Sequence, residues 1–317
     1  MLRVVHVAVG VVIGADNKIL IAKRPDNTHQ GGLWEFPGGK VDAGESVQHA
    51  LVRELHEELA IAVVDSAPLI KIRHNYSDKS ILLDVWKITK FDGEPLGNEG
   101  QPIRWVTPDE LMNFEFPAAN KPIVTAINLP QRWLVTGEAQ SHKEFIERTE
   151  LALRSGIKLI QLRVKNSLDP VFSELVSDMS ELCRIYSAKL QLNTSEENFL
   201  SLKNLPDHVG LHLNSNNLMQ MLFRSIDKSI LLSASCHNEI EIDHAQKIGI
   251  DFCCISPVLY TDSHRDAIVL GWERFAELVE KSTIPVYALG GMSDSDVTKA
   301  VALGAQGIAA ISVWWNQ

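Results

Sequence analysis

The sequence is poor in cysteine, and it lacks any long apolar run. Its four cysteines are Cys183, Cys236, Cys253 and Cys254, with no C-x-x-C spacing, so it indicates neither a zinc knuckle nor a disulfide framework. We expect reduced, buried thiols, as is usual in cytoplasmic proteins. No run approaches the roughly 18 apolar residues of a membrane span, and the N-terminus lacks the pattern of a signal peptide. We therefore expect a cytoplasmic protein with no membrane partner.

The sequence also lacks an excess of positive charge. Its 317 residues include 30 Lys and Arg against 40 Asp and Glu, a formal net charge of −10. This balance argues against a surface that coats nucleic acid, while a small basic pocket for phosphates remains compatible with it. We expect no direct nucleic-acid partner. Hydrophobic residues make up 45% of the chain, which suffices for a core, and the length suits two domains.

The first part of the chain alternates strand patterns with one or two helical ones. Residues 4–24 form two β-rich runs joined by a turn at Asp16-Asn17, and residues 81–91 form a further strand pattern. Residues 101–114 predict a strand followed by a short helix. This order predicts a compact α+β domain, with a mixed sheet and flanking helices, over residues 1–130.

The pattern changes after Pro130. Short, nearly all-apolar strand patterns alternate with helical ones such as 141–156 and 294–305. This alternation is typical of parallel strands with helical crossovers, and eight strands suggest closure into a small α/β TIM barrel over residues 131–317. The eight strand patterns lie at 132–137, 157–165, 188–193, 209–215, 230–238, 250–258, 284–291 and 306–313.

An acidic amphipathic stretch lies at residues 46–59, after a glycine-rich turn. Ala50, Leu51, Leu55 and Leu59 recur at helical spacing and predict its buried face. Three carboxylates share another face, while Arg53 forms an i, i+4 pair with one of them. A solvated surface helix is the simpler interpretation of any two such charges. Clustered carboxylates without matching basic partners are instead the usual oxygen ligands of Mg²⁺ or Mn²⁺, which then hold a polyphosphate. The three carboxylates are Glu54, Glu57 and Glu58.

The same stretch resembles the Nudix box, G-x5-E-x7-R-E-U-x-E-E-x-G-U. Gly39 is followed after five residues by Glu45 and, after seven more, by Arg53-Glu54-Leu55-x-Glu57-Glu58. Ala60 departs from the pattern where the family has the glycine of the turn after the helix. The segments "WEFPGGK", "GEPLGNEGQPIRW" and "FPAANKP" are similar to the MutT branch, the 8-oxo-dGTP diphosphatases.

The resemblance implies a role for each matching residue. Gly38 would lend a carbonyl oxygen to the metal, and Glu99 would be a further ligand or the base that deprotonates the attacking water. Arg24 and Lys79 would neutralise phosphate charge. Asn120 would contact the base, although an asparagine before Lys-Pro is also a common turn residue. The implied catalytic residues are Arg53, Glu54, Glu57, Glu58 and Glu99; the implied metal ligands are Gly38, Glu54, Glu57, Glu58 and Glu99; and the implied substrate contacts are Arg24, His29, Lys79 and Asn120.

An amide at position 120 suits the discrimination of 8-oxoguanine from guanine that the resemblance implies. The amide of asparagine carries one donor and one acceptor in a plane. 8-Oxoguanine presents an N7–H donor beside the O6 acceptor, whereas guanine presents two acceptors there. In the loop before the box, His29 and Trp34 either line the substrate pocket that the resemblance implies or pack against the rest of the domain.

The second part of the chain resembles thiamine phosphate synthase and its TenI-like relatives, through segments such as "IQLRVK", "VGLHLNS" and "YALGGMSDSDV". By that resemblance Gln161, Arg163 and Lys165 match residues at the diphosphate site, and the amides of Gly290 and Gly291 match a phosphate cradle. Two aspartates that hold Mg²⁺ in the synthase fall at Thr194 and Asn217 here. We therefore do not expect an active synthase. We expect a barrel that binds a phosphorylated ligand or only packs on its partner domain.

Three hypotheses follow. The first is a Mg²⁺-dependent hydrolase, with Mn²⁺ as an alternative ion, that converts 8-oxo-dGTP to 8-oxo-dGMP and pyrophosphate. The second is a Nudix hydrolase of a thiamine-pathway diphosphate, or a bifunctional protein with thiamine phosphate synthase activity. The third is a ligand-regulated or scaffolding protein. Asn120 favours the first over the second.

Overall fold

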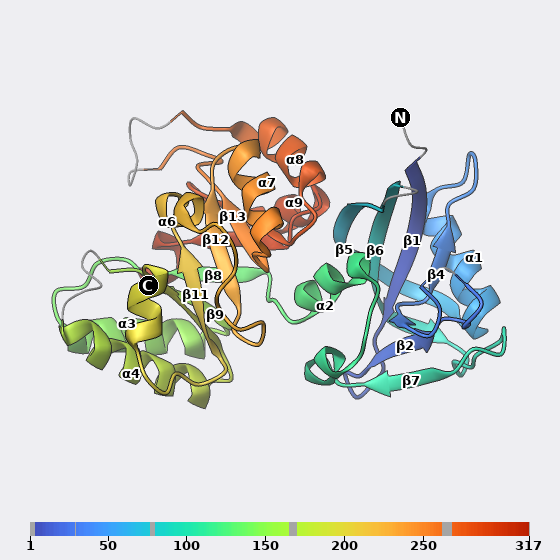
Figure 1. The fold of residues 1–317 in the computed structure, drawn as a ribbon, viewed down its shortest axis with the longest axis horizontal. Helices are drawn as coiled ribbons and strands as arrows, with labels where there is room; N and C mark the ends of the chain where they lie inside the picture. Colours follow the sequence, from blue (N-terminus) through green and yellow to red (C-terminus); the bar gives the residue numbers. More distant parts are fainter. Residues whose placement is uncertain (1–3, 29, 77–79, 165–169, 262–267, 317) are drawn as a thin grey trace. The chain divides into compact units, whose positions relative to one another are not determined.

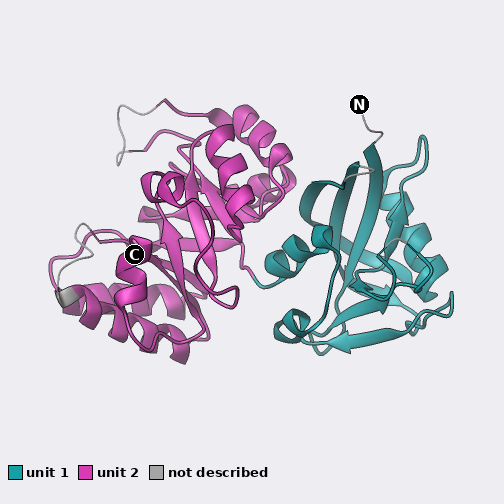
Figure 2. Cartoon of the chain, viewed as in Figure 1, with its two compact units in different colours: residues 1–128 teal, residues 129–317 magenta. Residues whose placement is uncertain are grey.

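A computed structural model describes residues 4–28, 30–76, 80–164, 170–261 and 268–316. The chain divides into two compact units, residues 1–128 and residues 129–317 (Figure 2). The sequence pattern predicts the division after residue 130. In the described part of the chain, no helix is both long and apolar enough to cross a membrane.

The first unit is built around strand β1, which is buried on both faces. β1 pairs parallel with β6 and antiparallel with β4, so its sheet, of order β4-β1-β6-β5, is mixed (Figure 1). Val9 and Val11 face the core that contains α2, whereas Ala8 and Val12 face the core that contains α1. A second sheet has the order β3-β2-β7. The elements are β1 (Val4–Val12), β2 (Ile19–Lys23), β3 (Trp34–Glu35), β4 (Gly38–Lys40), α1 (Val47–Leu59), β5 (Ala62–Asn75), β6 (Ser80–Asp92), β7 (Ile103–Val106), η1 (Asp109–Asn113), η2 (Ala118–Asn120) and α2 (Lys121–Ile127).

This arrangement confirms the predicted α+β fold and adds a strand that the pattern did not reveal. β5 is 14 residues long and pairs with β6 along its whole length. Its pairing register shifts between Val63 and Asp65, between Asp65 and Ser66, and between Pro68 and Ile70. Each bulge reverses the faces on which side chains lie, so the strand shows no sustained alternation of apolar and polar residues.

Helix α1 begins and ends through its own local chemistry. The Ser46 side chain accepts a hydrogen bond from the His49 N–H and caps the first turn. The buried residues are Ala50, Leu51, Leu55 and Leu59, as the sequence predicts. The helix ends at Ala60, which has φ 57° and ψ 29°, in the left-handed region that favours glycine. The substitution in the box is therefore accommodated at a cost in backbone strain.

The second unit is a closed barrel of eight parallel strands surrounded by helices, as predicted (Figure 1). Successive residues alternate between the barrel interior and the layer beneath the helices. Along β13, for example, Phe252 and Cys254 lie in the interior core with Trp133, whereas Cys253 and Ile255 pack under the helices. The elements are β8 (Arg132–Val135), α3 (His142–Arg154), β9 (Leu159–Leu162), α4 (Pro170–Ile185), β10 (Lys189–Asn193), α5 (Glu196–Ser201), β11 (Val209–Leu213), α6 (Ser215–Gln220), β12 (Leu232–Cys236), α7 (Glu239–Ile248), β13 (Phe252–Ile255), α8 (Gly271–Lys281), β14 (Val286–Leu289), α9 (Asp296–Ala302), β15 (Gly307–Ala310) and α10 (Ser312–Trp315).

Leu129, shortly before β8, belongs to the barrel core. Leu129 is 4% exposed and packs in the interior cluster with Trp133. Its carbonyl oxygen accepts a hydrogen bond of 2.7 Å from Gln306 Nε2, and the carbonyl oxygen of Pro130 accepts one of 2.5 Å from the Tyr287 hydroxyl. The segment that joins the units therefore closes one end of the barrel interior.

We predict that a barrel fragment starting at Gln131 is less stable than one starting at Leu129. The shorter fragment loses a buried leucine and leaves the Tyr287 hydroxyl and the Gln306 amide without these acceptors. Its free energy of unfolding should fall by at least about 3 kcal/mol. Urea unfolding of both fragments measures the difference, and Leu129→Ala in the full chain separates the side chain from the carbonyl groups. Equal midpoints for the two fragments would show that the segment does not close the core.

We also predict that Ala60→Gly stabilises the first unit. Glycine removes the strain of an L side chain at φ 57°, while its greater freedom in the unfolded chain offsets part of that gain. The net increase in the free energy of unfolding should be about 0.5–1 kcal/mol. The matched control is Ala62→Gly, in the neighbouring strand, where the same change should destabilise. The prediction fails if both substitutions lower the urea midpoint.

Candidate functional site

Arg53, on α1, bonds three carboxylates, one before the helix and two on it. Its guanidinium donates two hydrogen bonds to Glu45, of 3.1 and 3.0 Å, and one of 2.8 Å to Glu54. A longer bond of 3.4 Å reaches Glu57, and another of 3.0 Å reaches the Lys40 carbonyl oxygen. These bonds, first to Glu45 and then to Glu54, raise the pKa of Arg53 above its ordinary value. The i, i+4 pair of Arg53 and Glu57 is as the spacing predicts. The interpretation that the carboxylates of α1 lack a matching basic partner is wrong for Glu54, which Arg53 also binds.

Glu58 lies in a different environment on the same helix. Its carboxylate accepts a hydrogen bond of 3.0 Å from the Gly38 N–H at the start of β4. Burial is the main cause that raises the pKa of Glu58 to about 8, and the Gly38 hydrogen bond opposes this shift. The nearby negative charges that add to the rise belong to Glu35, Glu99 and Glu54.

The glycine turn allows the helix to approach the sheet this closely. A Cβ atom at Gly39 would lie 2.1 Å from Oε2 of Glu54, and one at Gly38 would lie 2.2 Å from the carbonyl oxygen of Ala8. Gly38 also has φ +144°, which L side chains rarely adopt. The two glycines therefore place backbone where the carboxylates of α1 can reach it.

Glu99 is brought to the helix by a short loop that is bonded to its C-terminal end. The Asn98 N–H and the Gln101 side chain both donate to the carbonyl oxygen of Glu58, at 3.0 and 2.8 Å. Gln101 in turn accepts a hydrogen bond of 2.9 Å from the Glu99 N–H. These contacts explain why a residue distant in the sequence affects the pKa of Glu58.

The carboxylate oxygens of this region are the kind of ligand that a hard divalent cation prefers, but they are not arranged around one point. Among the described residues, no group of three or more His, Cys, Asp or Glu side chains converges as a metal site. The side chain of Glu57 is 54% exposed, and that of Glu54 is held by Arg53. However, burial and then the negative charges of Glu35, Glu99 and Glu54 raise the pKa of Glu58, and a bound cation would stabilise its charged form.

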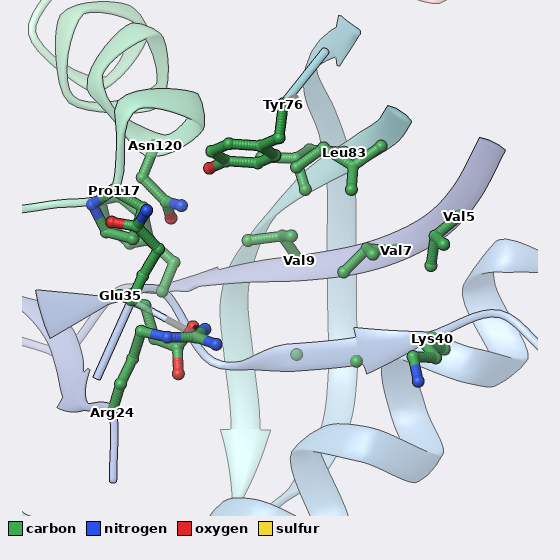
Figure 3. A pocket seen from close by; sticks show the side chains of 15 residues that line it. Val5, Val7, Val9, Arg24, Glu35, Lys40, Tyr76, Leu83, Pro117 and Asn120 are labelled. Carbon is green, nitrogen blue, oxygen red and sulfur yellow. Dashed lines mark hydrogen bonds and ion pairs between the residues drawn. The ribbon is translucent and has the colours of Figure 1, made fainter. Parts of the chain in front are cut away.

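A cavity of about 370 Å³ opens beside the glycine turn. Val5, Val7 and Val9 line it in a row along β1, and Leu83 extends this apolar surface from β6 (Figure 3). Gly38 and Gly39 also line the cavity. Glu54, Glu57 and Glu58 do not line the cavity themselves; it reaches them through Gly38, whose N–H bonds Glu58, and offers an apolar surface suited to a planar ring.

Asn120 lies at the far side of this cavity, at the junction of η2 and α2. Its side chain makes no capping hydrogen bond to α2, although it occupies the capping position. Figure 3 shows its amide on the same side of the cavity as the Tyr76 hydroxyl, next to Pro117. The turn-residue alternative accounts for its backbone position, since its N–H donates to the Pro117 carbonyl oxygen, but does not account for the direction of the amide.

Glu35 and Tyr76 are among the residues of this cavity that were not selected from the sequence. Glu35 forms an ion pair with Arg24, and burial raises its pKa while Arg24 opposes the shift. Tyr76, at the end of β5, also lines the cavity. Glu35 lies within the "WEFPGGK" segment, between two aromatic residues, and a carboxylate in such a setting was the available signal. Of the predicted substrate contacts, His29, Lys79 and Lys165 lie outside the described residues.

The barrel has a larger cavity at the carboxyl ends of its strands, of about 1030 Å³. Gln161, Arg163, Gly290 and Gly291 all line it, so the structure brings together the described residues predicted to bind phosphate. His237 lines it as well, with Nδ1 3.0 Å from a carboxylate oxygen of Glu241. None of the described lining residues is an aspartate.

The positions of the synthase aspartates are occupied by side chains that bond locally. Thr194 is 3% exposed, and its hydroxyl accepts a hydrogen bond of 2.7 Å from Asn198. The Asn217 amide donates a hydrogen bond of 3.3 Å to the carbonyl oxygen of Thr194. Neither residue is among those that line the cavity. Both positions therefore stabilise the strand ends instead of offering anionic oxygen to a ligand.

Comparison with known families assigns a different family to each of the two units. Residues 8–126 match the NUDIX domain, and residues 133–313 match thiamine monophosphate synthase. The chain therefore belongs to the Nudix family through its first unit and to the thiamine monophosphate synthase family through its second. The first unit is accordingly a hydrolase, whereas the departures at Thr194 and Asn217 distinguish the second from the family pattern.

Individual relatives point the same way. The 8-oxo-dGTP diphosphatase of Escherichia coli (strain K12) is 35% identical over 126 residues, which cover 40% of this chain and 98% of that protein. The CTP pyrophosphohydrolase of the same organism is 38% identical over 118 residues, covering 37% of this chain and 87% of that protein. A putative thiamine-phosphate synthase 2 of Aquifex aeolicus (strain VF5) is 29% identical over 188 residues, covering 59% and 99%.

Proposed function

We propose that the first unit hydrolyses nucleoside triphosphates with a divalent cation and prefers 8-oxo-dGTP, releasing 8-oxo-dGMP and pyrophosphate. The observation that carries the proposal is that one cavity is lined by Asn120, by the valine row of β1, by Gly39 of the box and by Gly38 just before it. A base on the valines would place its phosphates towards the carboxylates of α1. Water would add to phosphorus as the P–O–P bond breaks, so that pyrophosphate leaves.

The residues of the box divide this work. Glu54, Glu57 and Glu58, with the Gly38 carbonyl oxygen, would hold Mg²⁺ or Mn²⁺. Such an ion, when bound, neutralises the triphosphate and lowers the pKa of water. Arg53 holds Glu54 and Glu57 in place. Glu99, on the loop bonded to the end of α1, would accept the proton of the attacking water.

Asn120 would distinguish the oxidised base from guanine. Its amide can accept from the N7–H of 8-oxoguanine and donate to O6 at the same time. Guanine presents two acceptors along this edge, so one end of the amide would face an unfavourable partner. Arg24, paired with Glu35 at the cavity, would approach the phosphates or the ribose.

The chief alternative is hydrolysis of another diphosphate linkage. The family of the barrel favours a thiamine-pathway diphosphate, and the similarity to a CTP pyrophosphohydrolase favours CTP. The discriminating experiment is a panel of 8-oxo-dGTP, dGTP, CTP, hydroxymethylpyrimidine diphosphate and thiamine diphosphate with Mg²⁺, on the full chain and on residues 1–128. The proposal requires the highest kcat/KM for 8-oxo-dGTP in both proteins.

We also propose a cytoplasmic location, supported by the four buried, free cysteine thiols.

Glu57→Gln and Glu58→Gln should each reduce turnover at limiting Mg²⁺ by at least roughly 100-fold, because an amide keeps the size of the side chain and loses the charge that holds the ion. The matched control is Glu94→Gln, an exposed carboxylate outside the cluster, which should leave turnover unchanged. Circular dichroism checks that each variant is folded. Turnover near that of the wild type in both variants would sink the assignment of these ligands.

Asn120→Ala should lower kcat/KM for 8-oxo-dGTP by roughly 10- to 100-fold more than for dGTP, because a discriminating polar contact is worth about 1–3 kcal/mol. Asn113→Ala, an exposed asparagine in η1, is the control and should change neither value. Steady-state kinetics with both substrates measure the ratio. An equal loss on both substrates would show that Asn120 shapes the loop without reading the base.

For the second unit we infer a barrel that binds a phosphorylated ligand without forming thiamine phosphate. Arg163 and the backbone of Gly290 and Gly291 line its cavity and suit a phosphate. Thr194 and Asn217 offer no carboxylate where the family uses two. The alternative, a bifunctional chain with an active synthase, is favoured by the family match over residues 133–313.

We predict that residues 129–317 bind hydroxymethylpyrimidine phosphate but do not join hydroxymethylpyrimidine diphosphate to thiazole phosphate. Without the two aspartates, no carboxylate pair holds Mg²⁺ against the departing pyrophosphate. Calorimetry measures the affinity, and chromatography detects thiamine phosphate. Complementation of a thiamine phosphate synthase deletion by this fragment would establish the bifunctional alternative instead.

A further inference from the structure

The last turn of α1 is bonded by the loop that carries Glu99. A helix leaves its last four carbonyl oxygens without partners inside the helix. The first of these in α1, that of His56, accepts a hydrogen bond of 3.0 Å from the Ala60 N–H, which caps the helix. The other three accept hydrogen bonds from residues 96–101, here called the Glu99 loop, and belong to Glu57, Glu58 and Leu59.

These bonds fix the Glu99 loop to the helix that carries the box carboxylates. The Leu96 N–H donates to the Leu59 carbonyl oxygen at 3.1 Å, and the Asn98 side chain donates to the Glu57 carbonyl oxygen at 2.8 Å. Hydrogen bonds to two successive turns of backbone leave the loop little freedom to slide along the helix. The position of the loop is therefore set by α1.

Gln101 is the residue of the loop that bonds both α1 and Glu99. Its Nε2 donates a hydrogen bond of 2.8 Å to the Glu58 carbonyl oxygen, and its Oε1 accepts one of 2.9 Å from the Glu99 N–H. The orientation of the amide follows, because a carbonyl oxygen only accepts and an N–H only donates. One planar amide therefore sets the spacing between the backbones of Glu58 and Glu99, without using a carboxylate oxygen of either.

The turn before Gln101 is closed tightly against it. The Gly100 N–H donates a hydrogen bond of 2.9 Å to the Gly97 carbonyl oxygen. A Cβ atom at Gly97 would lie 1.9 Å from the carbonyl oxygen of Gln101, so that only glycine allows this approach. Glu99 is thus carried by a short turn whose end is bonded, through the Gln101 amide, to α1.

We propose that Gln101 is a positioning residue for the hydrolysis, which holds the backbone of Glu99 against the end of α1 so that the Glu99 carboxylate reaches the attacking water. This rests on the proposed role of Glu99 as the base. A base must lie within hydrogen-bond reach of the proton that it accepts. A displacement of about 1 Å can lower a rate by roughly 100-fold, so the spacing that the amide sets matters for turnover.

The test is a double-mutant cycle of Gln101→Met and Glu99→Gln in the full chain, with Mg²⁺ and whichever compound of the panel above is hydrolysed fastest. Methionine is close in size to glutamine and makes neither bond. We expect Gln101→Met to lower kcat by roughly 10-fold or more and to change KM by less than about 2-fold, because Glu99 acts on the water and not on substrate binding. In the Glu99→Gln background the same change should lower kcat by less than about 2-fold, since no base remains to be positioned.

Two further variants separate positioning from helix stability. Asn98→Ala removes a bond of the same length to the end of α1 and leaves the bond of the Glu99 N–H in place. It should lower the urea midpoint about as much as Gln101→Met, and its effect on kcat should multiply with that of Glu99→Gln. Gln101→Lys, which also serves if Gln101→Met does not fold, keeps a donor for the Glu58 carbonyl oxygen but offers no acceptor to Glu99. It should keep the urea midpoint and still lose roughly 10-fold in kcat.

The outcomes distinguish this inference from the proposed function on which it rests. An unchanged kcat in Gln101→Met or Gln101→Lys, or losses from Gln101→Met and Glu99→Gln that multiply, would overturn the positioning role and leave the proposed hydrolysis intact. Gln101 would then serve only to stabilise the end of α1. Full turnover in Glu99→Gln would instead remove Glu99 as the base, and the role of Gln101 would fall with it.

Discussion

The hydrogen bonds around Arg53 are the interaction on which the first unit depends. Glu54, Glu57 and Glu58 lie within two turns of one helix, where like charges destabilise. Arg53 compensates Glu54 and Glu57, is itself held by Glu45, and also donates to the backbone of β4. Glu58 is left to the Gly38 N–H and to burial. Helix α1 therefore carries one cluster in which Arg53 compensates the charges of Glu54 and Glu57. The glycine turn bonds the remaining carboxylate, that of Glu58, and the Glu99 loop bonds the backbone of the same residue.

In the barrel, the main constraint is that polar side chains inside a closed sheet need hydrogen-bond partners. Interior-facing polar groups on β10, β11 and β12 satisfy one another, as His212 does with the hydroxyls of Ser233 and Ser235. The opposite wall is aromatic, and its closure includes Leu129 from the segment between the units. Because the interior is packed, ligand chemistry is confined to the mouth, where the residues at the strand ends decide what is bound. Thr194 and Asn217 show that such residues can change while the fold persists.

The sequence predicted the fold well because periodicity reports burial. The apolar face of α1 was found from its helical spacing, and the eight barrel strands were found as short, nearly all-apolar runs between helical patterns. β5 was missed because its bulges interrupt alternation. At the site, the box carboxylates were found through their motif and the Arg53–Glu57 pair through its i, i+4 spacing. The bonds from Arg53 to Glu45 and Glu54 were not anticipated, since they depend on rotamers that sequence spacing does not specify. Glu35 and Tyr76 were missed for a similar reason: they meet only through the packing of β3 and β5 around one cavity.

The central claim is that one cavity both holds an oxidised purine and presents its phosphates to the box. Calorimetric titration of the full chain with 8-oxo-dGMP and with dGMP, in the presence of Mg²⁺, tests it most directly because product binding needs no turnover. The account predicts that 8-oxo-dGMP binds at least ~10-fold more tightly, a difference of about 1.4 kcal/mol. Equal affinities for the two nucleotides would contradict it.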